Sequence, residues 1–158
     1  DCRPQEICAF QLERLNAAFN LNDKSCYDNM TVSRVELIDS QGNVKDSFHT
    51  NEGLGVKIKF RPFKSGNNLY LWAGLFRSDD IYCHGAFRKL GKEEDAVHLV
   101  YPSLPLLTGK YYLSAGIWSL DKKEPLYYSH KALEFDMHYS GEDHGTVYLK
   151  HIWRWQLP

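Results

Sequence analysis

In three apolar segments of the sequence, side chains that could recognise a ligand occur at alternate positions. Residues 69–76 read LYLWAGLF, residues 110–118 read KYYLSAGIW, and residues 126–132 read LYYSHKA. A β-strand sends alternate side chains to opposite faces. In the first two segments one face is therefore core-like, and the other holds aromatic rings with small residues between them. The segment 126–132 could add Tyr128 and His130 on one side of this face. The ring-bearing face comprises Tyr70, Trp72, Phe76, Tyr112, Ser114, Trp118, Tyr128 and His130.

Rings and hydroxyl groups in this arrangement suit the chemistry of a carbohydrate. Flat aromatic rings can stack on the C–H face of a sugar, and Ser or His can hydrogen-bond its hydroxyls. The pattern predicts a glycan-binding surface made by the eight residues above. Protein interfaces are also rich in Trp and Tyr, and an N-terminal segment could cover the same face. The residues alone leave these three interpretations open.

Motifs for catalysis are missing from the sequence. It has no GxxxxGK[ST], GxSxG, HExxH or GxGxxG motif, and the TGK at 108–110 stands alone. His138 and His144 flank the acidic SGED at 140–143, which we interpret as a solvated loop in preference to a metal site. A net charge of −1 and a pI near 6.7 also argue against nucleic acid as a partner. We expect a binding protein with no catalytic residues, metal or cofactor.

The elements that must position the ring-bearing face are strands. From Met30 onward, short apolar segments alternate with turns rich in Gly, Asn, Asp and Ser, and no helical pattern separates them. This predicts an all-β fold, an immunoglobulin-like antiparallel β-sandwich of nine or ten strands. The third and sixth strands of such a sandwich are neighbours. We therefore expect 69–76 to lie beside 110–118, flanked by 81–87 and 126–132. The other predicted strands are 31–39, 44–50, 54–63, 97–102 and 146–155.

The two ends of the chain raise separate questions. Residues 1–29 are predicted to be a lead-in or linker segment with room for one short helix at 7–19, and residues 30–158 form the sandwich domain. The apolar strand at 146–155 must pair with something, either within its own sandwich or in a partner. For the cysteines we expect reduced thiols in the cytoplasm, with two disulfides as the alternative. They are Cys2, Cys8, Cys26 and Cys83.

The order of several segments resembles a known family. TVSRVELIDSQGNVKDSFHTNEGLGVKIKF is followed by NLYLWAGLF, PLLTGKYYLSAGIW, LEFDM and GTVYLKHIWRW. Over roughly residues 30–155 this resembles the C-terminal domain of the ATP-binding subunits of ABC transporters that export O-antigen and related polysaccharides, the Wzt family. The pieces that carry the resemblance are V-x-L-x-D-x-x-G, L-x-x-G-x-Y-x-L-S-x-G-I and G-x-V-x-L-x-H-x-W.

The resemblance implies both a fold and a function. It implies an immunoglobulin-like sandwich that binds the non-reducing end of a lipid-linked polysaccharide and selects it for export. It further implies a homodimer with an exchanged C-terminal strand, an upstream ATPase domain, and a cytoplasmic location at the inner face of the membrane beside the transporter's membrane subunit. The family supplies no residue motif for the glycan site, so the site residues rest on the alternation of side chains alone.

Overall fold

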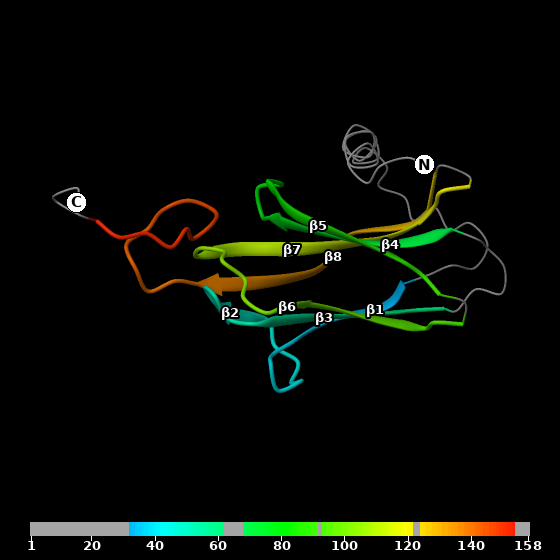
Figure 1. Cartoon of the computed structure of the whole chain (residues 1–158), viewed down its shortest axis with the longest axis horizontal. Helices are drawn as coiled ribbons and strands as arrows, with labels where there is room; N and C mark the ends of the chain where they lie inside the picture. Colours follow the sequence, from blue (N-terminus) through cyan, green and yellow to red (C-terminus); the bar gives the residue numbers. More distant parts are fainter. Residues whose placement is uncertain (1–31, 62–67, 92, 122–123, 154–158) are drawn as a thin grey trace.

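The protein folds as two facing β-sheets (Figure 1). The computed structural model describes residues 32–61, 68–91, 93–121 and 124–153. Within these ranges there are eight strands and no helix, so none that could cross a membrane. The strands are β1 Val32–Ile38, β2 Ser47–His49, β3 Leu54–Phe60, β4 Leu69–Arg77, β5 Tyr82–Lys89, β6 Ala96–Tyr101, β7 Gly109–Ser119 and β8 Glu124–His138.

The strand order confirms the predicted sandwich. One sheet has three strands in the order β1-β3-β6, and the other has five in the order β2-β8-β7-β4-β5. All pairs are antiparallel except β2 with β8, which is parallel over its three residues. The expected neighbours are also confirmed, because β4 lies between β5 and β7, and β8 lies on the other side of β7.

The main core lies between the two sheets and follows the predicted alternation. Leu69, Leu71 and Leu75 of β4 are buried there, together with Val56 and Ile58 of β3. Burying an aliphatic side chain of this size contributes about 1.5–3 kcal/mol. This aliphatic layer therefore determines which face of each central strand points inward. The ring-bearing positions of β4 and β7 are left to the outer face of the five-stranded sheet.

The hairpin that joins β4 to β5 brings an acidic residue to that outer face. Asp80 has a positive φ of 67°, which Asp tolerates better than most residues because its short polar side chain can bond locally. The turn is closed by the Asp80 N–H, which donates to the Arg77 carbonyl at 2.9 Å. The chain reversal places Asp80 beside the end of β7 that carries Tyr112.

The prediction of a strand over 146–155 is wrong for the described residues of that segment. Only one bridge forms, between Leu106 and Val147. It is flanked by hydrogen bonds from Leu107 N to Thr146 O (3.0 Å) and from Tyr148 N to Pro105 O (2.7 Å). The next antiparallel bond would require an N–H on Pro105, which proline lacks. The ladder stops there, and the segment runs out beyond the ends of the strands (Figure 1).

Other predictions differ in their limits or lie outside the described residues. The predicted strand at 44–50 shrinks to the three residues of β2, and the predicted end of 54–63 lies beyond the described part. The lead-in segment at 1–29, with Cys2, Cys8 and Cys26, lies outside the described residues. Cys83 carries a free thiol, and burial raises its pKa.

Candidate functional site

The predicted site residues lie on three adjacent strands of the five-stranded sheet. In the register of β4 and β7, Tyr70 is opposite Trp118 and Phe76 is opposite Tyr112. Four buried rings form a cluster that is separate from the core between the sheets, and Tyr128 of β8 packs against it. We call this the outer aromatic cluster: Trp72, Phe76, Tyr112, Trp118 and Tyr128.

Small residues allow these rings to lie flat on the sheet. An added Cβ at Gly74 would stand 2.9 Å from Phe76 Cε2 and closer still to the six-membered ring of Trp72. An added Cβ at Gly85 would stand 3.0 Å from Trp72 Nε1. Trp72 stacks on Tyr128 with ring centroids 6.0 Å apart, and Phe76 stacks on Tyr112 at 5.0 Å. The alternation of rings with small residues is therefore a packing requirement of this face.

The rings are less accessible than the alternation pattern suggested. Trp72 is 0% exposed and Tyr112 1% exposed, and Phe76, Ser114 and Trp118 are buried as well. Tyr70 and Tyr128 are half-buried, and His130 is exposed. A ligand that approaches the face in this conformation meets Tyr70, Tyr128 and His130 first. The buried rings lie beneath and beside these groups.

Neither indole N–H group of the cluster has an acceptor among the described residues. In the part of the chain that the structure describes, the indole N–H groups of Trp72 and Trp118 are buried and make no hydrogen bond. An unpaired buried donor costs roughly 1–3 kcal/mol, and such groups in a folded protein call for an explanation. An oxygen-rich ligand that reached the face would supply acceptors for both.

The outer face has a polar end where β8 departs from regular pairing. Leu113 pairs with Leu133 and Ala115 with Ser129, so Ser114 alone faces the three residues from His130 to Ala132. The Ser114 Oγ accepts a hydrogen bond from the Lys131 backbone N–H at 3.2 Å. Ser114 therefore stabilises a β-bulge, a feature that often re-aims a side chain near a binding site.

Lys131 and Asp80 belong to this polar end, although neither was predicted from the sequence. The Lys131 Nζ lies 4.9 Å from the centre of the Tyr112 ring and 3.9 Å from Asp80 Oδ1. The Tyr112 hydroxyl donates to Asp80 Oδ1 at 2.8 Å. Strict alternation would have placed Lys131 on the inner face with Ser129 and Leu133, so only knowledge of the bulge could have identified it.

The pKa values of two rings at the polar end, Tyr112 and His130, are shifted in the direction that favours the neutral form. Burial, followed by the hydrogen bond to Asp80, raises the pKa of Tyr112, which keeps its hydroxyl protonated as a donor. Burial and then the nearby Lys131 charge lower the pKa of His130. A neutral imidazole can donate at one nitrogen and accept at the other, which suits a sugar hydroxyl.

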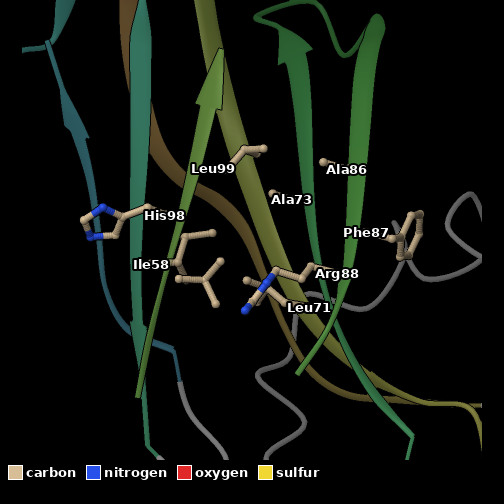
Figure 2. Close-up of a pocket in the computed structure, with 9 residues that line it drawn as sticks. Ile58, Leu71, Ala73, Ala86, Phe87, Arg88, His98 and Leu99 are labelled. Carbon is tan, nitrogen blue, oxygen red and sulfur yellow. The ribbon is translucent and has the colours of Figure 1, made fainter. Parts of the chain in front are cut away.

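A small cavity lies away from this outer face. A cavity of about 70 Å³ opens between the sheets, lined by side chains of β3, β4, β5 and β6. Figure 2 shows Arg88 and Leu71 directed toward this gap, while the Phe87 ring lies away from it on the other side of β5. Ligand pockets usually measure about 300–1,000 Å³, so the cavity is too small for a sugar ring.

The loop after β8 does not assemble a metal centre. Within the described ranges, no three His, Cys, Asp or Glu side chains are placed to hold a metal ion. His138 Nε2 is 2.9 Å from Ser47 Oγ, and the Tyr139 hydroxyl donates to Asp143. The first contact joins β8 to β2, and the second lies within the loop.

Comparison with known proteins finds similarity at the level of structure but not of sequence. No family model matches the chain, and no curated protein matches it in sequence. Among solved structures, it is similar to the crystal structure of the C-terminal domain of Wzt, with a TM-score of 0.68 and 14% sequence identity. The match covers 84% of this chain and 87% of that one. The sandwich described above therefore has the fold of the C-terminal domain of Wzt, as the resemblance in sequence implied.

Proposed function

We propose that this chain is a non-catalytic glycan-binding domain that selects a polysaccharide for ABC-transporter export. One observation carries the proposal: β4 and β7 are adjacent, and both place aromatic rings, with small residues between them, on the same outer face of the sheet. Similarity in fold to the C-terminal domain of Wzt supports the same function. The ligand is the non-reducing end of a lipid-linked, O-antigen-like polysaccharide, as the Wzt family resemblance implies.

The proposed glycan site consists of Tyr70, Trp72, Phe76, Tyr112, Ser114, Trp118, Tyr128 and His130. Tyr128 and Tyr70 provide accessible ring surface for stacking, and His130 reads a hydroxyl. The buried rings hold these groups in place, and the unpaired indole donors favour an oxygen-rich ligand. Individual contacts of this kind are modest, so we expect dissociation constants in about the micromolar to millimolar range.

A fluorescence titration tests the proposal. The isolated domain is titrated with the polysaccharide of the organism that carries the gene and with an unrelated polysaccharide, while Trp emission is followed. We expect saturable binding of the first only, weakened in Tyr128→Ala and unchanged in Val100→Ala, which alters an exposed side chain on the three-stranded sheet. If neither polysaccharide binds but a purified transporter subunit does, the outer face is a protein-docking surface and the proposal fails.

We also propose that the domain forms a homodimer by exchange of its C-terminal segment. Leu149 is 75% exposed and Trp153 93% exposed, with Ile152 similarly open to solvent. Exposed apolar side chains on a segment with few internal hydrogen bonds favour pairing with a second copy. Light scattering should find a dimer for the parent and a folded monomer for a chain that ends at Tyr148. A monomeric parent, or a truncated chain that stays dimeric, would contradict the exchange.

In the cell, we propose that the domain works in the cytoplasm at the inner face of the membrane. There it would be joined to an ATPase domain and act beside the transporter's membrane subunit. Such tethering raises the effective concentration of a weak binding site, and two sites per dimer add avidity.

A further inference from the structure

The bulge in β8 places the side chain of Lys131 on the outer face of the sheet, where a regular strand would place it on the inner face. Ser129 pairs with Ala115, and Leu133 pairs with Leu113, both on the inner face of the sheet. Lys131 lies two residues from each and would point inward in a regular strand. Its ammonium instead lies 4.9 Å from the centre of the Tyr112 ring on the outer face.

This placement requires an unfavourable backbone conformation. Lys131 has a φ of 48°, in the left-handed region where a residue with a Cβ is disfavoured. Of the positive-φ residues other than Gly among the described residues, only Lys131 lies inside a strand. Such outliers tend to persist at functional sites, where the surrounding structure holds them. Here the Ser114 Oγ holds the Lys131 N–H at 3.2 Å.

We propose that Asp80 and Lys131 form a specificity subsite that reads two neighbouring hydroxyls of an uncharged sugar. The inference rests on the proposed glycan-binding function and names the class of sugar. The Lys131 Nζ and Asp80 Oδ1 are 3.9 Å apart, longer than the roughly 2.7–2.9 Å of a direct charge-assisted hydrogen bond. Both groups therefore keep capacity for a ligand: the ammonium donates to one hydroxyl, and the carboxylate accepts from the other.

The charges at the subsite favour a neutral sugar over an anionic one. Lys131 and Asp80 offset each other, and Glu134, exposed and opposite Tyr112 in the register, adds another acidic group. His130 has its pKa lowered by burial and by Lys131, so it adds no charge at neutral pH. A phosphate or carboxylate on the ligand would meet at least as much negative as positive charge, which is unfavourable for an anion.

The test compares the parent chain with variants of the subsite, using the polysaccharide of the organism that carries the gene as the probe. Lys131→Gly and Lys131→Asn both accept a positive φ, so the urea midpoint should stay equal or rise. We expect affinity to fall about fivefold or more in each, and to fall also in Asp80→Asn. Lys59→Ala, an exposed residue on the three-stranded sheet, is the matched control and should bind as the parent does.

Two further arms identify what the subsite recognises. Raising the salt concentration tenfold should change parent affinity less than twofold, because hydroxyls carry no charge to screen. Periodate cleavage of the vicinal diols in the probe, followed by borohydride reduction, should abolish binding. Parent-like affinity in both Lys131 variants, or steep weakening by salt, overturns the subsite while leaving the proposed glycan function in place. Failure of the parent to bind the untreated probe overturns both.

Discussion

Replacement of Gly74 by alanine should disrupt the outer aromatic cluster while leaving the core between the sheets intact. The new methyl group would overlap the six-membered ring of Trp72 and stand 2.9 Å from Phe76 Cε2. Trp72 is 0% exposed and Phe76 2% exposed, so neither ring can swing freely into solvent. One of them must leave its position over the glycine.

The size of the effect follows from two opposing contributions. Forcing an extra methyl into a well-packed cluster costs about 1–3 kcal/mol. The alanine also reduces the conformational entropy of the unfolded chain, which returns about 0.4–1 kcal/mol. The free energy of unfolding should therefore fall by roughly 1–2 kcal/mol. With a urea m-value of about 2 kcal/mol/M, the midpoint shifts down by about 0.5–1 M.

Urea denaturation followed by tryptophan emission measures this change. Gly91→Ala is the matched control, because its added Cβ would meet only the flexible end of the Glu94 side chain at 3.2 Å. Its midpoint should differ from the parent by an amount equivalent to about 0.5 kcal/mol or less. If Gly74→Ala has the parent's midpoint and an unchanged emission maximum, the Trp72 ring does not lie over Gly74 and our account of the cluster is incorrect.

Two further predictions concern the polar end of the outer face. Tyr112→Phe removes the hydroxyl that donates to Asp80 at 2.8 Å, so the free energy of unfolding should fall by about 0.5–1.5 kcal/mol; a urea midpoint equal to the parent's would contradict this. Burial, then Lys131, lowers the pKa of His130 below its ordinary 6.5, so the unfolded chain binds more protons and stability should fall as the pH drops below about 6.5. His130→Gln should therefore lose less stability than the parent between about pH 6.5 and 5 in urea titrations, and equal losses would exclude this role.

Most of the fold could be predicted because it depends on alternation and turns. Leu69, Leu71 and Leu75 occur on every second position of one strand, and this is enough to define its inner face. The adjacency of β4 and β7 followed from counting strands in an immunoglobulin-like order. The end of the last predicted strand could not be found this way, because it depends on Pro105 lying opposite Tyr148 in three dimensions.

The candidate site could be predicted only in part. Alternation correctly grouped the rings of β4 and β7 on one face, but it could not show that Trp72 and Tyr112 lie flat and buried. That outcome depends on side-chain torsions and on Gly85 in a neighbouring strand. Lys131 was missed because period-two alternation assigns it to the inner face, and a bulge is a local exception to that period.

The bulge of β8 also has a consequence for how this fold can change over evolution. It inserts two residues relative to β7, and two is the side-chain period of a strand. The same alternate positions of β8 therefore face the core before and after the bulge, with Tyr127 opposite Ile117 and Phe135 opposite Tyr111. Gains or losses of residue pairs at this point would exchange the groups presented to a ligand without reshuffling the hydrophobic layer. A sheet interior thus acquires the tolerance to length variation that proteins usually confine to their loops.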